Sequence, residues 1–322
     1  MGIADKQIAG YLEHLQTQRK LSLHTLDNYR RDLQQLKDFL AKHHPAGELG
    51  SLTQADIRRC TSQLHARGLS PSSIARKLSA WRGLFAWLAH HQTVAANPVD
   101  GVRAPKRIKA LPKALGVDDA VRLVSSTLTG DDRSVTRDAC NKAMFELLYS
   151  SGLRVAELIS LDLHHVKTAG HESISWIALD EGELTVTGKG SKRRSVPIGA
   201  AAVTALRDWL AVRPQLQRAN PDDDAYALFL SARGHRITAR EVQRRIKAHA
   251  QSLGIPANVH PHVLRHSFAS HVLQSSGDLR AVQEMLGHAS IASTQVYTSL
   301  DFQRLAQVYD AAHPRAKKQG GS

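Results

Sequence analysis

The chain has 322 residues, a length that suggests two domains, each large enough to bury a core of its own. It carries 43 Lys and Arg residues against 29 Asp and Glu residues, a formal net charge of +14. With 42% hydrophobic and 22% charged residues, the composition excludes a disordered or fibrous chain. The charge surplus favours a polyanionic partner, usually nucleic acid, although an anionic membrane as partner or a basic secreted protein would fit the same net charge.

Cysteine content and hydropathy predict the cellular compartment of the protein. Cys60 and Cys140 lie in different halves of the chain, in helix-like sequence without C-x-x-C spacing, which predicts reduced, half-buried thiols rather than a disulfide framework. Residues 1–18 include Asp5 and Glu13 and no apolar h-region, and no run of about 18 apolar residues occurs. We therefore expect a cytoplasmic protein with no membrane insertion.

Residues 1–100 are expected to form a compact bundle of about four helices. Apolar residues at spacings of three and four mark one helix around residues 8–15 and another over residues 24–42. A third begins after Thr53 as N-cap and stops at Gly68, and a fourth begins with Ser70 as N-cap and Pro71 at its first position. Positive charge is denser here, because residues 1–110 sum to +9 and the rest to +5.

Residues 101–115 separate this bundle from a second domain. They hold two prolines, five basic residues and no acidic one, which predicts a basic interdomain linker. Residues 116–322 are expected to be mostly helical, with short strands near residues 174–177, 184–186 and 196–198. Helices are expected over 138–150, 155–161, 200–212, 238–253, 263–273, 278–286, 290–298 and 302–311. The fold class is therefore mainly α with a small antiparallel β-sheet.

The first candidate for chemistry is the segment Ser151–Leu158, a turn followed by the start of a helix. Arg154 falls in the first turn, where the helix dipole disfavours a cation, so its presence suggests that it binds a phosphate attracted by the free N–H groups. A surface ion pair between Arg154 and Glu157 would explain the same residues.

The second candidate is the hairpin turn Gly188–Arg194, which contains Lys189. A Walker A loop is excluded, because the required upstream glycine position holds Glu183 and Gly190 follows the lysine. A lysine on such a turn can reach into a DNA groove or protonate a leaving oxygen. The simpler alternative is a cationic β-turn.

The third candidate is the helix that carries His262 and Arg265, which are i,i+3 neighbours on one face. His262 and His266 could suggest zinc, but the Glu of H-E-x-x-H is missing and no third ligand is evident. An imidazole beside a guanidinium suits a phosphate better than a cation. A polar helix face remains the alternative.

The fourth candidate is Gly287-His288, followed nine residues later by Tyr297. A tyrosine is a poor nucleophile unless its phenol is deprotonated or its transition state is stabilised by neighbours. Most helical tyrosines are packing groups instead. Two arginines, a turn lysine, two histidines and a late tyrosine are nevertheless the set that phosphoryl transfer without metal requires.

In order and spacing this set resembles the signature of tyrosine recombinases of the phage-integrase family, carried here by Arg154, Lys189, His262, Arg265, His288 and Tyr297. The resemblance covers essentially the whole chain and is most detailed from His260 to Lys318. It implies a SAM-like core-binding domain over residues 1–100 and a catalytic domain over residues 116–322. The two would form a C-shaped clamp on DNA.

The resemblance also implies a role for each residue. Tyr297 would attack the scissile phosphate, form a 3′-phosphotyrosyl bond and free a 5′-hydroxyl. Arg154 and Arg265 would bind that phosphate, and His288 would hydrogen-bond a non-bridging oxygen. Because the phosphotyrosine conserves the phosphodiester energy, the family needs neither ATP nor metal, and no cofactor is expected.

The resemblance assigns the remaining proton transfers to two residues. Lys189 would protonate the leaving 5′-oxygen, and His262 would assist proton transfer at the phosphate or tyrosine. Residues 164–182 look like an insertion relative to the family, which leaves Lys192 as the alternative to Lys189. We keep Lys189 because it occupies the family's first lysine position.

The partners that the resemblance implies are double-stranded DNA with a recombination site, a paralogous recombinase in a cyclic heterotetramer and a septal DNA translocase. The reaction would resolve chromosome dimers at cell division, at the nucleoid. The apolar stripe of Phe302, Leu305 and Val308 would pack on a neighbouring subunit. Two alternatives stay open: an integrase of a mobile element, and a helical DNA-binding regulator that never cuts.

Overall fold

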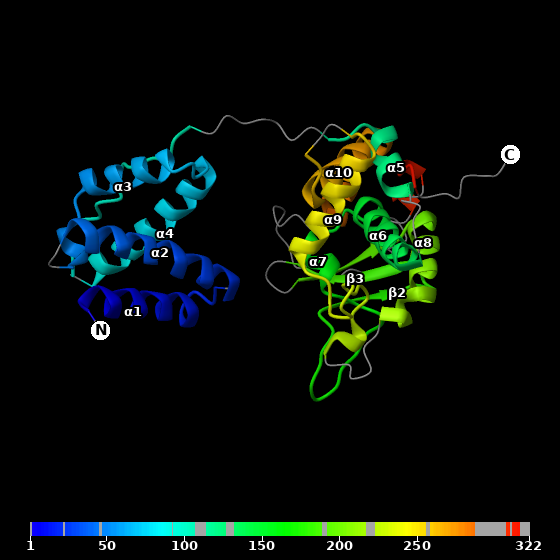
Figure 1. Cartoon of the computed structure of the whole chain (residues 1–322), viewed down its shortest axis with the longest axis horizontal. Helices are drawn as coiled ribbons and strands as arrows, with labels where there is room; N and C mark the ends of the chain where they lie inside the picture. The colour runs from blue at the N-terminus through cyan, green and yellow to red at the C-terminus, as the bar shows by residue number, and fades with distance from the viewer. Residues whose placement is uncertain are drawn as a thin grey trace. The chain divides into compact units, whose positions relative to one another are not determined.

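The computed structural model describes residues 2–21, 23–44, 47–91, 93–106, 114–126, 132–188, 192–216, 223–255, 258–286, 307–309 and 311–315. The chain divides into two compact units, Met1–Ala110 and Leu111–Ser322 (Figure 1). Within the described part of the chain, no helix combines the length and the apolar character needed to cross a membrane.

The first unit is helical, as its apolar spacing predicts. Its α-helices are α1 (Ile3–Thr17), α2 (Leu23–His43), α3 (Gln54–Ala66) and α4 (Pro71–His90), with a 3₁₀ turn η1 at Leu49–Ser51. The predicted caps are confirmed: the Thr53 side chain accepts a hydrogen bond from the Asp56 N–H, and the Ser70 side chain accepts one from the Ser73 N–H. Gly68, just beyond α3, has the positive φ of +84° that favours glycine.

A buried ion cluster joins α2 to α4 inside this helical core. The Asp32 carboxylate is fully buried and pairs with Arg76 and with Lys77, whose Nζ lies 2.7 Å from Oδ1. The Trp81 indole N–H donates to the Asp32 carbonyl at 2.8 Å. Because an unpaired buried charge is costly, the Asp32 carboxylate ties α2 to α4 through these contacts.

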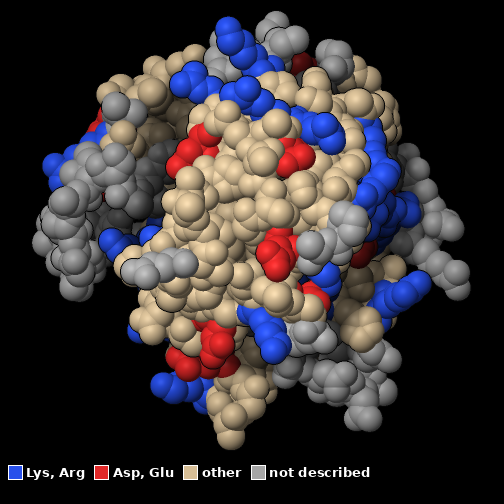
Figure 2. All heavy atoms as spheres, turned by 90° about the vertical axis from the view of Figure 1, so that its left-hand side faces the viewer, with Lys and Arg blue, Asp and Glu red and all other residues tan. Residues whose placement is uncertain are grey.

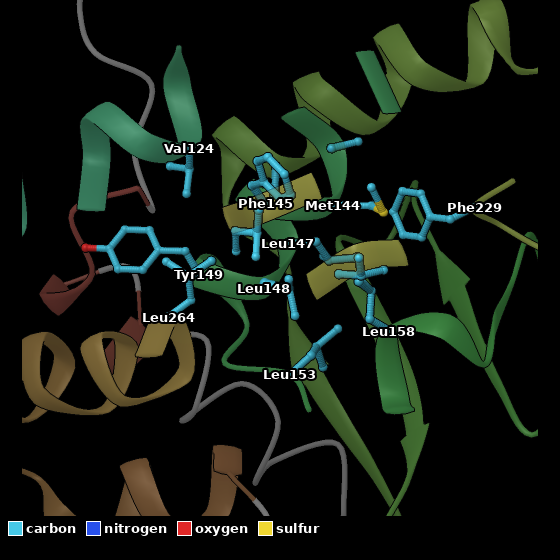
Figure 3. Close-up of a cluster of buried hydrophobic side chains, with 14 of the residues drawn as sticks. Val124, Met144, Phe145, Leu147, Leu148, Tyr149, Leu153, Leu158, Phe229 and Leu264 are labelled. Atoms are coloured by element: carbon cyan, nitrogen blue, oxygen red, sulfur yellow. The ribbon is translucent and has the colours of Figure 1, made fainter. Parts of the chain in front are cut away.

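The second unit surrounds a long central helix. Its α-helices are α5 (Val117–Ser125), α6 (Asp132–Ser150), α7 (Val155–Ile159), α8 (Ala200–Val212), α9 (Ala239–Ser252), α10 (Pro261–Ser276) and α11 (Leu279–Leu286), with 3₁₀ turns η2 (Arg213–Leu216) and η3 (Asp223–Tyr226). Large side chains of α6 fill the core, as Figure 3 shows for Met144, Phe145, Leu147 and Leu148. The sequence patterns did not single out α5.

The small sheet has the strand order β1 (Leu161–Asp162), β2 (Ser175–Ala178), β3 (Glu183–Thr187) and β4 (Arg193–Pro197). The pairs β2–β3 and β3–β4 are antiparallel, which confirms the three predicted strands. The small antiparallel sheet of the prediction is confirmed for these strands, and the sheet as a whole is mixed because β1 pairs with β2 in parallel. A strand of two residues is too short to show an alternating pattern.

Both cysteines are free and buried in the cores of their units. Burial raises the pKa of the Cys60 thiol to about 11 and that of Cys140 to about 12. At neutral pH both are therefore protonated and behave as small apolar groups.

The described part of the closing segment packs on its own unit. Tyr309 and Ala312 are buried in a cluster with Phe268 of α10 and Met285 of α11, and Val308 packs against it. The Arg315 guanidinium pairs with the buried Glu146 carboxylate of α6. In the isolated chain, Val308 therefore has an apolar neighbour without a second subunit. Three other predictions lie outside the described residues: the helix over residues 290–298, Phe302 and Leu305.

Candidate active site

The turn that precedes Arg154 is fixed by close packing. Gly152 has φ +57°, and a Cβ built on it would lie 2.4 Å from Cδ1 of Phe268, so only glycine fits there. Leu153 and Leu158, on either side of the first turn of α7, are buried in the core (Figure 3). These contacts hold Arg154 at the start of α7, where the structure makes it the N-cap residue rather than a first-turn residue.

Glu157 pairs with Arg154 but not as a surface ion pair. The Arg154 backbone N–H donates to Glu157 Oε2 at 2.8 Å, and Arg154 Nη1 donates to Oε1 at 2.8 Å. The Glu157 side chain is only 3% exposed, whereas that of Arg154 is 35% exposed. The pair therefore joins a buried carboxylate to a guanidinium that reaches the surface.

Arg265 of α10 lies in the same cluster. Its Nη1 donates to the Gly152 carbonyl at 2.5 Å, its Nη2 donates to the Leu286 carbonyl at 2.6 Å, and Nη1 lies 3.8 Å from Glu157 Oε2. The structure thus brings together the two arginines that the sequence assigns to phosphate binding. Both are held by the turn after α6 and by the carboxylate between them.

A third arginine, which the sequence analysis missed, completes this group. Arg194 of β4 donates from Nη1 and Nη2 to the two oxygens of Glu157, at 2.8 and 3.0 Å, and from Nε to the Met285 carbonyl at 3.0 Å. We call Arg154, Arg194, Arg265 and Glu157 the arginine cluster. One signal was available: Arg194 and Val196 share the inward face of β4, and an inward-facing charge needs a partner.

The hairpin turn that leads to Lys189 begins beside the arginine cluster. A Cβ built on Gly188 would lie 3.6 Å from Arg194 Nη1 and 3.8 Å from Glu157 Oε1. The Gly188 N–H donates to the Lys192 carbonyl at 2.9 Å, which closes the described ends of the turn. Lys189 itself lies outside the described residues, and Lys192 is exposed.

Of the remaining predicted site residues, His262 lies within the described part of the chain. His262 is exposed on the first turn of α10, and its ring lies 6.0 Å from that of His260. His288 and Tyr297 lie outside the described residues. The chain reaches them from the end of α11, whose carbonyls at Met285 and Leu286 accept hydrogen bonds from Arg194 and Arg265.

The arginine cluster is electrically positive at neutral pH. Burial raises the pKa of Glu157, but the hydrogen bonds and charges of Arg194 and Arg154 outweigh it, and the pKa lies below its ordinary value. Burial, and next the charge of Arg154, lower the pKa of Arg265 to about 10. Three guanidiniums and one carboxylate therefore carry a formal charge of +2, an arrangement suited to a phosphate.

The chain matches two family sequence patterns. Residues 115–304 match the phage integrase family, and residues 8–92 match the phage integrase N-terminal SAM-like domain. The tyrosine recombinase XerC of Ralstonia pickettii is 59% identical over 97% of this chain and 94% of its own length. The XerC of Pseudomonas aeruginosa is 46% identical over 97% of this chain and 96% of its own.

Solved structures share the fold at lower identity. A lambda integrase dimer bound to a core site has a TM-score of 0.64 at 16% identity, covering 91% of this chain and 99% of that one. The XerH recombinase bound to its difH substrate has a TM-score of 0.60 at 21% identity, covering 91% and 81%. The family matches and the XerC relatives establish that the chain belongs to the phage integrase family and is a site-specific tyrosine recombinase, most similar to XerC.

Proposed function

We propose that this recombinase cuts and rejoins DNA with the six residues Arg154, Lys189, His262, Arg265, His288 and Tyr297. The observation that carries the proposal is the placement of Arg154 and Arg265 around one buried carboxylate, although they come from different helices of the fold. Two guanidiniums held in this way can bind both non-bridging oxygens of one phosphate. A regulator that never cuts would have no use for this arrangement.

In the proposed step, the Tyr297 phenol oxygen forms a new bond to the scissile phosphorus, and the bond from phosphorus to the 5′-oxygen breaks. The phenol loses one proton, with His262 assisting, and the 5′-oxygen gains one from Lys189. Protons and electrons therefore balance without a metal, ATP or other co-reactant. His288 donates a hydrogen bond to the phosphate, and reversal of the step with a new 5′-hydroxyl rejoins the strand.

We propose that residues 1–100 are the core-binding domain, residues 101–115 a basic linker and residues 116–322 the catalytic domain, and that both domains contact the duplex. Support comes from charge: Arg58, Arg59 and Arg67 are exposed on and just after α3. Figure 2 shows Lys and Arg side chains gathered along the upper and right-hand margins of one face. Such contacts release counterions, so DNA binding should weaken steeply with salt.

The partners are proposed from the relatives. Because the chain is 59% identical to a XerC, we propose that it acts with a XerD-type paralogue in a cyclic heterotetramer at a dif site. The reaction would convert chromosome dimers to monomers under a septal FtsK-type translocase, in the cytoplasm at the nucleoid. An integrase of a mobile element is the second candidate, favoured only by fold-level likeness to the Tn1549 integrase, at 17% identity and a TM-score of 0.65.

A covalent adduct tests the proposed chemistry. The protein, with its paralogue, is incubated with a nicked dif duplex in the presence of a chelator, and adducts are separated on a denaturing gel. We expect an adduct that Tyr297→Phe abolishes and that Tyr226→Phe, the matched control outside the predicted set, leaves intact. No wild-type adduct on any recombination site would contradict catalysis and favour simple DNA binding.

The lysine assignment has a separate test. A duplex whose leaving 5′-oxygen is replaced by sulfur needs no proton donor, because a thiolate is a good leaving group. Lys189→Ala should cleave the ordinary duplex slowly and the sulfur duplex at the wild-type rate. Lys192→Ala is the matched control, and the reverse pattern would move the assignment to Lys192.

Deletion of the gene separates the two candidate functions. Loss of a chromosomal resolving enzyme should produce chains of unsegregated cells, because dimeric chromosomes block division. Normal division after deletion would favour the integrase of a mobile element.

A further inference from the structure

Arg194 is the member of the arginine cluster to which the proposed chemistry gives no role. Its side chain is 5% exposed, whereas that of Arg154 is 35% exposed. Among the described residues, its hydrogen bonds go to three protein acceptors, the two oxygens of Glu157 and the Met285 carbonyl. Arg194 is therefore placed to act on other residues of the site rather than on DNA.

The negative charge of Glu157 explains why the site needs a third arginine, Arg194. This carboxylate fixes Arg154 through a backbone and a side-chain hydrogen bond, and it lies 3.8 Å from Arg265. Without Arg194, the two phosphate-binding arginines and Glu157 would sum to a formal +1. With Arg194 the sum is +2.

The charge of the reacting phosphate determines which net charge of the site speeds cleavage. A phosphodiester carries one negative charge, and attack by a phenolate oxygen gives a five-coordinate phosphorus group with two. A site of charge +2 therefore matches the transition state better than the ground state, which is the condition for faster chemistry. A site of charge +1 would match the substrate instead.

The bonds of Arg194 also fix the end of α11. Its Nε binds the Met285 carbonyl, and Arg265 Nη2 binds the next carbonyl, that of Leu286. The two guanidiniums thus hold neighbouring carbonyls of one helix end. In the sequence, His288 and Tyr297 follow this helix end.

We propose that Arg194 is a positioning residue for DNA cleavage: it neutralises Glu157 and fixes the end of α11, which leaves the charge of Arg154 and Arg265 to the scissile phosphate. The inference rests on the proposed function of the six residues. It predicts that the rate of cleavage follows the net charge of the cluster, which a purely structural role of Arg194 does not predict.

Three variants distinguish the proposed charge-balancing role of Arg194 from a purely structural role. Arg194→Gln lowers the charge of the cluster to +1, Arg194→Lys keeps +2 without the two-pronged hydrogen bond, and the double variant Glu157→Gln/Arg194→Gln restores +2 without either ion. Single-turnover adduct formation is measured on the nicked duplex at saturating protein, and DNA affinity is measured separately. Arg194→Gln should react roughly a hundredfold more slowly with nearly unchanged affinity, and the double variant should recover roughly tenfold or more.

Arg245→Gln is the matched control. The Arg245 side chain is 7% exposed and pairs with Glu241 on α9, so its loss also removes a buried guanidinium of the same domain. We expect a lower thermal midpoint and a wild-type rate of adduct formation from the folded protein. If Arg194→Gln does not fold, Arg194→Lys and the double variant, both at +2, should still react within about tenfold of wild type.

Several results would overturn the proposal. The first is a wild-type rate of adduct formation for Arg194→Gln. The second is a double variant Glu157→Gln/Arg194→Gln that reacts no faster than Arg194→Gln alone. The third is a rate roughly a hundredfold below wild type for both variants that keep a cluster charge of +2. A wild-type protein that forms no adduct would remove the proposed function and this inference together. An active wild type with an active Arg194→Gln would remove only the inference.

Discussion

Each unit of the molecule buries a carboxylate among cations, and the two clusters differ in their formal charge. In the first unit, Asp32 ties α2 to α4 through the buried Lys77 and through Arg76, whose side chain is 43% exposed, for a formal charge of +1. In the second unit, Glu157 contacts three arginines, from the start of α7, from β4 and from α10, for a formal charge of +2. We propose that the larger positive charge around Glu157 serves a phosphate, whereas the Asp32 cluster serves stability.

Removing Arg265 should have the largest effect on function. Arg265→Ala deletes a guanidinium from the proposed phosphate site and leaves the Gly152 and Leu286 carbonyls without this donor. We expect single-turnover cleavage to fall about a thousandfold. The exposed pair-forming Arg122→Ala is the control, and a rate within about threefold of wild type for Arg265→Ala would break the distinction between the two clusters.

Removing Asp32 should instead affect stability alone. Asp32→Ala leaves the buried Lys77 ammonium unpaired, which should lower the free energy of unfolding by about 3–5 kcal/mol, measured by denaturant titration. Asp27→Ala, which breaks the exposed pair with Arg30, should change it by less than about 0.5 kcal/mol. Slower cleavage by the folded Asp32→Ala protein would contradict the assignment of this cluster to stability.

Substitution of Gly152 should lower both the stability and the cleavage rate, because Gly152 shapes the turn that holds the arginine cluster. Gly152→Ala meets Phe268 and a positive φ, and should cost about 3 kcal/mol of unfolding free energy and slow cleavage. Gly182→Ala is the matched control, with φ +63° and open space around its Cβ, and should cost about 1 kcal/mol. Equal costs for the two variants would mean that contact with Phe268 does not shape the site.

The smallest expected effect is on pH dependence. The folded-state pKa of Glu157 is lowered, so its ion pairs stabilise the fold fully above the ordinary pKa of 4.5 and lose that contribution as the pH falls below it. Unfolding free energies of wild type and Glu157→Gln should therefore converge as the pH drops below this value. A constant difference across that range would show that the Glu157 charge contributes nothing.

Much of the fold could be predicted because its helices carry regular apolar stripes and recognisable caps. The predicted helix over residues 200–212 coincides with α8, and Thr53 and Ser70 cap α3 and α4 as expected. The two-residue strand β1 could not be predicted, because periodicity needs a longer segment. Its parallel pairing with β2 therefore had no counterpart in the sequence patterns.

The site was predictable only in part, for a different reason. Arg154 and Arg265 were predicted from their chemistry and order along the chain, and the structure places both beside Glu157. The roles of Glu157 and Arg194 depend on tertiary contacts between residues 37 apart, which no local pattern encodes. The sequence suggested a surface pair for Glu157, and only its burial shows that it is the centre of the cluster.

The central claim is that Arg154 and Arg265 bind the same scissile phosphate. The most direct measurement is a crystal structure of Tyr297→Phe on a dif duplex with its paralogue. We predict that both guanidiniums donate to non-bridging oxygens of one phosphate, while Glu157 stays paired with Arg194. A scissile phosphate that lies beyond hydrogen-bond distance of Arg265, or that is bound by Arg194 instead, would contradict the account.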